Sequence, residues 1–403
     1  MYQLDEAMDR AKIKVVGVGG AGNNALNTMI ISELEGVDFI CANTDAQALR
    51  ATRAQTVLQL GPNLTKGLGA GSNPEIGRQA ALEERDRIAE MLEGSDMVFV
   101  TAGMGGGTGT GAAPVIAQIA REVKALTVGV VTKPFTIEGK LRRNSAEEGL
   151  RHMRNSVDSL IVIPNDRLLA AGGKKMTLRD SFAMADSVLY QAVRGISDII
   201  QMPGMINVDF ADVHAVMENQ GLALMGVGEG HGENRATEAA EMAISSPLLD
   251  NINIKGARGV LLNITAPSTF GMDEFHTAVS IIQEEAHEDC LFKFGVVFDE
   301  SLQDTLRITV IATGFEELPS MKAERKVANL RATGTTGWNP NATATATRMG
   351  TTTNRDIAPV SVRPERDFQA PEGVTRHEAL GRVANDNIDD QFDVPAWLRK
   401  QRD

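Results

Sequence analysis

Two glycine-rich loops constrain the fold of this chain more than any other feature. The first is GVGGAG at 17–22, and the second is GMGGGTGTG at 103–111, with six glycines in nine residues. Each loop follows a run of apolar residues and precedes a helical segment. Glycine loses more backbone entropy on folding than any other residue, so a purely structural turn would use one or two. A flexible linker is a poor interpretation between a buried strand and a helix. We therefore expect both loops to approach a ligand closely.

The first part of the chain alternates short apolar runs with helical segments. Val- and Ile-rich runs occupy 13–18, 37–42, 56–60, 97–101, 126–132 and 160–163. Amphipathic stretches at 74–92 and 114–124 separate some of them. Short apolar strands joined by helices are typical of a parallel sheet that is covered on both faces. Because both glycine loops follow strands of that sheet, we expect them at the same edge.

A long helix and a smaller unit follow. Thr177 and Asp180 resemble a capping box, and apolar residues then recur at helical spacing up to a Pro-Gly pair at 203–204. The smaller unit mixes expected helices at 209–219, 234–244 and 272–285 with strands at 258–265, 294–298 and 306–312. The predicted fold class is α/β. A parallel-sheet, ligand-binding domain at 12–176 is joined by a central helix at 177–203 to a smaller α+β, mixed-sheet domain at 204–316.

The two ends of the chain differ from this pattern. Residues 1–11 are charged and lack the apolar stretch of a secretory signal, so we expect a flexible N-terminus. Residues 317–388 are dominated by polar residues with some proline, which predicts a disordered linker. In the last segment, 389–403, apolar Trp397 and Leu398 stand beside basic Arg399 and Lys400. This favours a short partner-binding peptide at Asp393–Lys400.

The overall composition excludes several classes of protein. A net charge of −13 argues against non-specific nucleic-acid binding. Two cysteines cannot make a disulfide framework, and Cys41 lies in an apolar run that predicts a buried, inert thiol. No apolar stretch is long enough to cross a membrane. The six histidines are scattered without metal-ligand spacing, so structural roles are expected for them. We expect a soluble, cytoplasmic protein with no direct membrane insertion.

The glycine loops suit a phosphate-bearing ligand, because backbone N–H groups at a helix N-terminus bind anions. The first loop matches GxGxxG, and Asp45 lies at the end of the next strand, so an NAD-dependent Rossmann enzyme is one alternative. That alternative leaves the second loop unexplained. The GxxxxGK[ST] motif of P-loop enzymes does not occur in the chain. Two loops at one sheet edge could hold several phosphates between them.

The run GGGTGTG at 105–111 resembles the tubulin/FtsZ family of GTPases. Similar segments are NTDAQAL at 43–49, KGLGAG at 66–71, TKPF at 132–135, IPND at 163–166 and NVDFAD at 207–212. The resemblance implies a polymerising cell-division protein that binds GTP or GDP with Mg²⁺ and acts at the division site. It also implies head-to-tail self-assembly, and contacts of the C-terminal peptide with an actin-like membrane tether and other division proteins.

The resemblance also assigns residues to the nucleotide. The implied contacts are Gly19, Gly20, Ala21, Gly22, Asn23, Asn24, Gly69, Ala70, Gly71, Gly103, Gly105, Gly106, Gly107, Thr108, Gly109, Glu138, Arg142, Asn165, Phe182 and Asp186. Residues 69–71 would sense the γ-phosphate, and Asp45 would lie near the metal through water. Ala21 and Asn23 depart from the pattern, since many relatives have more glycine there.

Several of these residues have plainer interpretations. By spacing alone, Glu138 and Arg142 would form an exposed ion pair worth roughly 0.3–0.5 kcal/mol. Phe182 would be a core residue and Asp186 a solvated acid, and Asn24 would bond a helix terminus. The resemblance instead places Glu138 and Arg142 on ribose and phosphates, and Asn24 on the base side. It stacks Phe182 on guanine, where the Asp186 carboxylate would accept from N1–H and N2–H and select GTP over ATP.

Two acids precede the helix expected at 209–219. Alone, Asp209 and Asp212 would be an N-cap and a first-turn acid worth about 1 kcal/mol. The resemblance implies that one subunit inserts this loop into the nucleotide site of the next. There Asn207, Asp209 and Asp212 would polarise the attacking water. A second alternative is a relative that binds GTP without hydrolysing it, and the presence of both acids argues against that.

Overall fold

A computed structural model describes residues 11–172, 176–202, 204–246, 248 and 256–315. The described residues all belong to one compact unit. Residues 1–10 of the expected flexible N-terminus, the linker at 317–388 and the peptide at 389–403 lie outside the described residues.

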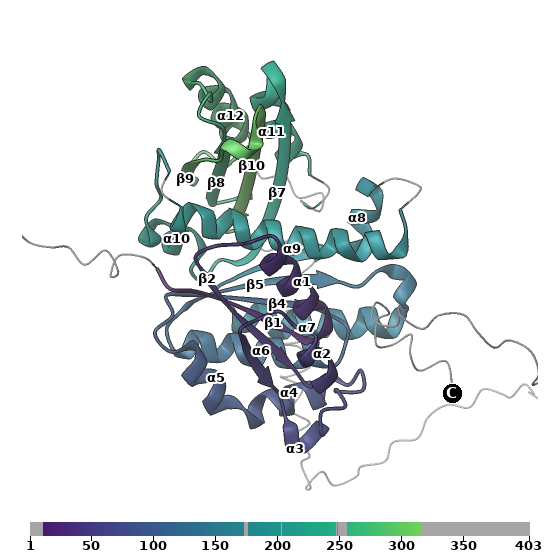
Figure 1. Cartoon of the computed structure of the whole chain (residues 1–403). Helices are drawn as coiled ribbons and strands as arrows, with labels where there is room; N and C mark the ends of the chain where they lie inside the picture. Colours follow the sequence, from purple (N-terminus) through teal and green to yellow (C-terminus); the bar gives the residue numbers. More distant parts are fainter. Residues whose placement is uncertain (1–10, 173–175, 203, 247, 249–255, 316–403) are drawn as a thin grey trace, which may run out of the picture. The chain divides into compact units, whose positions relative to one another are not determined.

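One ten-stranded sheet runs through the described part, in the order β3-β2-β1-β4-β5-β6-β7-β10-β8-β9 (Figure 1). Its strands are β1 (Ile13–Val18), β2 (Val37–Asn43), β3 (Thr56–Gln59), β4 (Met97–Gly103), β5 (Leu126–Lys133), β6 (Ser159–Pro164), β7 (Gly221–His231), β8 (Gly259–Ala266), β9 (Leu291–Phe298) and β10 (Thr305–Thr313). The strands from β3 to β7 are parallel to their neighbours, whereas β10 is antiparallel to β7 and β8. The direction of the strand order reverses between β1 and β4, and open α/β sheets bind ligands at such a switch point.

Helices cover both faces of the parallel half, as predicted. The α-helices of the described residues are α1 (Gly19–Ile31), α2 (Ala46–Arg50), α3 (Pro62–Thr65), α4 (Pro74–Glu83), α5 (Arg85–Leu92), α6 (Thr108–Glu122), α7 (Lys140–Ser156), α8 (Asn165–Gly172), α9 (Leu178–Gln201), α10 (Phe210–Met217), α11 (Arg235–Ile244) and α12 (Met272–Glu285). Side chains alternate along β1. Ile13 and Val15 pack into the core under α1 and α9, whereas Val16 and Val18 pack into the core under α4 to α7. A third core lies between β8–β10 and α11 with α12.

The central helix begins as its sequence predicts. The Thr177 side chain accepts from the Asp180 N–H at 3.2 Å, and the Thr177 N–H donates to the Asp180 carboxylate at 3.2 Å. This reciprocal pair is a capping box at the start of α9. From there α9 runs for 24 residues, with a buried stripe that includes Leu189, Val193 and Ile196. The predicted α/β fold class is confirmed for the described residues.

Three local expectations differ from the structure. The stretch 74–92 is two helices, because Glu84 leaves the helical conformation at φ −103° and ψ 18°. Helix α6 begins at Thr108, so half of the second glycine loop forms its first turn. Strand β7 was not predicted, since glycines interrupt its apolar pattern. Those glycines allow α11 to pack closely, because a Cβ on Gly228 would lie 2.0 Å from the Ala239 carbonyl oxygen. Strand β7 thereby joins the two predicted domains in one sheet.

Candidate functional site

The two glycine loops lie against each other. Strands β1 and β4 pair in parallel with Val18 opposite Ala102, so both loops leave the same edge of the sheet. A Cβ built on Gly19 would lie 2.9 Å from the Gly109 nitrogen. A Cβ built on Gly103 would lie 2.6 Å from the Ala21 Cβ. Contacts this close require glycine at these positions in both loops. A larger residue at either position would force the two turns apart.

Both loops end in helix N-termini that are free to bind an anion. Helix α1 begins at Gly19 and α6 at Thr108, and the N-cap residues Val18 and Gly107 offer no side-chain cap. The first intrahelical bond of α6 runs from the Gly111 N–H to the Gly107 carbonyl oxygen at 3.1 Å. The preceding N–H groups therefore have no intrahelical acceptor. Together with two helix dipoles, they favour negative charge at this edge.

A third loop, residues 67–73, lies against the two glycine loops. We call these three loops together the cradle. The Gly69 N–H donates to the Thr44 carbonyl oxygen at 3.2 Å, and the Thr44 and Thr108 hydroxyl oxygens are 2.6 Å apart. A Cβ on Gly107 would lie 2.9 Å from the Ala70 Cβ. Three segments that are distant in sequence therefore meet beside β1 and β4.

The surface of this cradle is open. A Cβ added at Gly20, Gly71 or Gly106 would meet no atom of the described residues within 4 Å. Ala21 and Asn24 are also exposed on the first turns of α1. The cradle thus presents backbone with little side-chain cover, which suits close approach of phosphate groups.

Asn23 supports the first loop from below. It is 4% exposed. With its amide nitrogen toward the turn, it donates to the carbonyl oxygens of Gly17 at 2.8 Å and Gly19 at 3.1 Å. Its amide oxygen accepts from Asn43 Nδ2 at 3.0 Å. These bonds fix the turn in place of the glycine that the resemblance leads one to expect.

A line of contacts connects the second loop to α9. A Cβ on Gly105 would lie 2.8 Å from the Arg142 Cγ, and Arg142 forms an ion pair with Glu138 at 3.0 Å. Glu138 accepts from the Phe135 N–H at 2.8 Å, and the Phe135 ring meets Phe182 edge-on at 5.2 Å. The Glu138–Arg142 pair therefore forms, but its carboxylate is 7% exposed rather than solvated.

Two polar groups on this side, the half-buried Asp186 and the buried Asn165, have environments that are unusual for polar side chains. Burial raises the pKa of the Asp186 carboxyl to about 7, so the interpretation of Asp186 as a solvated acid is wrong. Asn165, at the start of α8, is 5% exposed, and its Oδ1 accepts no hydrogen bond from any described residue. Buried polar atoms are normally satisfied. Both groups are therefore suited to a ligand that brings hydrogen-bond donors.

Residues 204–212, which we call the acidic loop, lie at the amino edge of the strands, opposite the carboxyl edge that carries the glycine loops. Asp209 caps α10 by accepting from the Asp212 N–H at 2.7 Å, which confirms its N-cap role. At the end of α10, the Met217 carbonyl oxygen accepts from the hydroxyl of Ser159, the first residue of β6, at 2.6 Å. The glycine loops follow the last residues of β1 and β4. Asp212, in the first turn of α10, pairs with Lys293 near the start of β9. A strand of seven residues such as β4 spans roughly 23 Å, so the acids do not reach the glycine loops of their own chain.

The other members of this loop have local partners. Asn207 Oδ1 accepts from the Gly204 N–H at 2.7 Å. Backbone bonds of 3.0 Å join Met205 and Ile206 to Val296 on β9. Asp212 forms an ion pair with Lys293, also on β9, at 2.6 Å. No motif or spacing in the chain predicts that Lys293 meets Asp212.

The structure offers little support for a metal site made of protein ligands alone. Asp45 caps α2 by accepting from the Gln47 N–H at 2.8 Å. Across the described ranges, no three His, Cys, Asp or Glu side chains gather as metal ligands. No helix in the described part is both long and apolar enough to cross a membrane.

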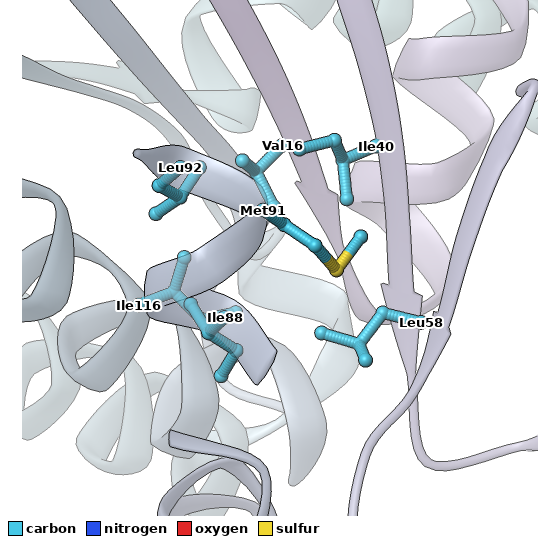
Figure 2. Close-up of a pocket in the computed structure, with 7 residues that line it drawn as sticks. All are labelled: Val16, Ile40, Leu58, Ile88, Met91, Leu92 and Ile116. Carbon is cyan, nitrogen blue, oxygen red and sulfur yellow. The ribbon is translucent and has the colours of Figure 1, made fainter. Parts of the chain in front are cut away.

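One pocket lies between the sheet and helices α5 and α6 (Figure 2). Its volume is about 10 Å³, and it is lined entirely by apolar side chains of Val16, Ile40, Leu58, Ile88, Met91, Leu92 and Ile116. It belongs to the core between the sheet and α5 with α6. A pocket of this size without polar groups cannot hold a nucleotide, so we interpret it as imperfect core packing.

Comparisons with known proteins agree with the geometry. Residues 12–173 match the model of the Tubulin/FtsZ family, GTPase domain, and residues 221–316 match the FtsZ family, C-terminal domain. The chain is 51% identical to the cell division protein FtsZ of Pseudomonas aeruginosa and 49% identical to that of Pseudomonas putida, in both cases over all of both chains. A structure of an empty FtsZ dimer from M. jannaschii matches 76% of this chain and 88% of its own length, with 46% identity and a TM-score of 0.73.

These matches decide between the two fold-compatible interpretations. The strand order β3-β2-β1-β4-β5-β6 also occurs in Rossmann enzymes, so topology alone does not exclude an NAD-dependent enzyme. An NAD-dependent enzyme leaves the second glycine loop unexplained, and the two matched family domains do not favour that interpretation. The chain belongs to the FtsZ family of tubulin-like cell-division GTPases.

Proposed function

We propose that this GTPase hydrolyses GTP only between two copies of itself, which stack head to tail. The observation that carries the proposal is the position of the acidic loop: Asp212 pairs with Lys293 near the start of β9, and the end of α10 bonds the start of β6, whereas the glycine loops follow the carboxyl ends of β1 and β4. A second copy, displaced along the strand direction, brings one edge onto the other. Such a contact is heterologous and does not close, so it generates a filament.

Exposed apolar side chains on both edges support this contact. Leu68, Ile137 and Leu141, beside the nucleotide cradle, are 85%, 76% and 89% exposed. Met205 and Ile206, beside the acidic loop, are 75% and 36% exposed. Large apolar side chains in such clusters are typical of surfaces that become buried in an assembly.

The cradle residues would bind and orient the nucleotide. The free N–H groups of the α1 and α6 N-termini would hold its phosphates. The carboxylate of Asp186 would accept from guanine N1–H and N2–H, with Phe182 against the base and Asn165 Oδ1 taking a further donor. Glu138 and Arg142 would lie toward the ribose and phosphates. Residues 69–71, next to Gly107, would follow the γ-phosphate.

Hydrolysis needs positioning and charge stabilisation more than covalent chemistry. Asp209, Asp212 and Asn207 of the neighbouring copy would orient a water for attack on the γ-phosphorus. The bond from phosphorus to the β–γ bridging oxygen then breaks, and GDP and inorganic phosphate leave. Mg²⁺ would neutralise charge on the phosphates, held mainly by phosphate oxygens and water with Asp45 in its outer shell. Loss of the γ-phosphate would weaken the contact between subunits.

The remaining roles are proposed from family membership. Residues 393–400 would bind an actin-like membrane tether and other division proteins, and the filament would act in the cytoplasm at the division site. The proposed domain limits lie at 176/177 and 203/204. The central helix between them, α9, would connect the nucleotide-binding domain to the domain that carries the acidic loop.

A mixing experiment tests completion of the site in trans. Asp212→Ala keeps a sound cradle but a defective acidic loop. Gly20→Asp keeps the acidic loop but places a carboxylate in the cradle, where there is space for the side chain and where its charge would compete with and repel the phosphates. Each variant alone should hydrolyse GTP slowly. An equal mixture should recover up to roughly a quarter of wild-type turnover, because that share of random heterologous contacts joins a sound cradle to a sound loop. No recovery in the mixture would refute the proposal, and Gly20→Ala serves as the control for the fold.

A further inference from the structure

We propose that Lys293 is a positioning residue for hydrolysis, which holds the carboxylate of Asp212 in place and offsets its charge as it enters the neighbouring site. This inference rests on the proposed function of the acidic loop. It concerns a residue on β9, far along the chain from the loop itself.

The geometry fixes Asp212 from two sides. Its N–H donates to Asp209 at 2.7 Å, and its Oδ1 lies 2.6 Å from Lys293 Nζ. The two side chains of the ion pair are 31% and 37% exposed, so both remain within reach of a docking surface. Strand β9 also binds the start of the acidic loop through Val296. The same strand therefore anchors the loop and supplies the cation.

The placement of Lys293 in the strand is unusual. It stands between Phe292 and Phe294, which pack against the core that β9 forms with α12. Because side chains alternate along a strand, Lys293 points to the other face, where Asp212 meets it. A lysine in an otherwise apolar, partly buried strand requires a partner or access to solvent. Here the partner is one of the two acids proposed to act on GTP.

The charge of Lys293 solves an electrostatic problem. In the proposed contact, two carboxylates approach a triphosphate, and like charges at such distances repel. The ammonium group offsets one of these charges without leaving the subunit that carries it. A lysine binds as a compact point charge, so contact with Oδ1 leaves Oδ2 of Asp212 free to accept from the attacking water. The ion pair also restricts the rotamers of Asp212 before the subunits meet.

The test compares GTP turnover of Lys293→Met and Lys293→Arg with the wild type, at subunit concentrations well above the assembly threshold. Lys293→Met should lower turnover by about fivefold, the effect of losing one well-placed, partly exposed ion pair. Binding of GTP to the isolated subunit should stay unchanged. Lys293→Arg should recover most of the loss. In an Asp212→Asn background, Lys293→Met should have no further effect, because its role acts through the carboxylate.

Arg307→Met is the matched control. Arg307 forms an ion pair with Glu229 at 2.7 Å on the same sheet, with side chains 24% and 41% exposed, but on strands that do not hold the acidic loop. Its loss should leave turnover per assembled subunit unchanged.

The possible results separate this inference from the proposed function. Wild-type turnover in Lys293→Met would overturn the role of Lys293 while leaving completion in trans intact. An equal loss in the Asp212→Asn background would overturn it too, since Lys293 would then act elsewhere. Failure of the mixing experiment above would refute the proposed function instead. If Lys293→Met lowers the melting temperature, Lys293→Gln, which keeps most of the apolar stem, takes its place in the same comparison.

Discussion

The raised pKa of Asp186 predicts that guanine binding depends on pH in the neutral range. Recognition of N1–H and N2–H requires the ionised carboxylate, because a protonated carboxyl has lost acceptor capacity. With a pKa of about 7, roughly one tenth of the subunits carry an ionised Asp186 at pH 6 and about nine tenths at pH 8. GDP affinity should therefore rise by about tenfold from pH 6 to pH 8 through this group alone, which is about 1.4 kcal/mol.

Calorimetric titration with GDP at pH 6, 7 and 8 measures the effect. The phosphates of GDP also titrate near pH 6, so the comparison needs Asp186→Asn, which keeps an acceptor oxygen but no titrating group. The titration of the phosphates is common to both proteins and cancels in the ratio of their affinities. That ratio should change by about tenfold over the pH range. A constant ratio would refute the placement of the Asp186 carboxylate against the base.

The same pKa predicts an effect on stability, with the opposite dependence on pH. In the unfolded chain Asp186 ionises near pH 3.8, whereas in the folded chain it keeps its proton up to about pH 7. Between these values the folded state binds more protons, so the free energy of unfolding falls as pH rises. Relative to Asp186→Asn, the nucleotide-free wild type should lose stability from pH 4 to pH 7, by up to about 4 kcal/mol. Chemical unfolding of both proteins across this range measures the difference, and parallel curves would contradict it.

Three further predictions use other parts of the structure. Gly107→Ala would place a Cβ 2.9 Å from the Ala70 Cβ, so GTP affinity measured by titration should fall by at least about tenfold; unchanged affinity would show that the third loop is not part of the cradle. Burial raises the pKa of the Cys41 thiol, so a thiol reagent at pH 8 should modify it only as fast as the chain unfolds, and rapid modification of the native protein would contradict its burial. Arg235 lowers the pKa of Glu274, so their ion pair stabilises the fold above about pH 4.5, and this contribution is lost as pH falls further. Glu274→Gln should therefore weaken the dependence of the melting temperature on acid pH. An unchanged dependence would argue against the ion pair.

The parallel half of the fold was predictable because its strands are buried on both faces. Such strands are continuously apolar, and the predicted bounds of β1 agree with the structure. Strand β7 escaped prediction because Gly226, Gly228 and Gly230 replace apolar residues along it. Gly228 and Gly230 are required by the close packing of α11, which is a tertiary constraint that no local pattern expresses. The early start of α6 was missed for a related reason, since glycine and threonine have low helix propensity but the first turn is held by neighbouring loops.

The site was predictable where it depends on backbone and not where it depends on burial. Two glycine loops that follow parallel strands must share a sheet edge, so their meeting followed from topology. The raised pKa of Asp186, the unpartnered Asn165 oxygen and the Lys293–Asp212 pair depend on how distant elements pack. For the acidic loop, spacing gave the N-cap at Asp209 correctly but not its position at the opposite edge.

That position links hydrolysis to assembly through geometry alone. If the acids reached the glycine loops of their own chain, turnover per subunit would be the same at every protein concentration. Because roughly the length of β4 separates the two edges, the proposed site exists only at contacts between copies. Turnover plotted against total protein should then show a threshold, followed by a linear rise as every added subunit enters a filament. Asp212→Ala should keep the same threshold for assembly measured by sedimentation with GTP, while its turnover stays low above it. A constant turnover per subunit below the threshold would mean that one chain completes its own site, and the separation of the two edges would then have no catalytic meaning.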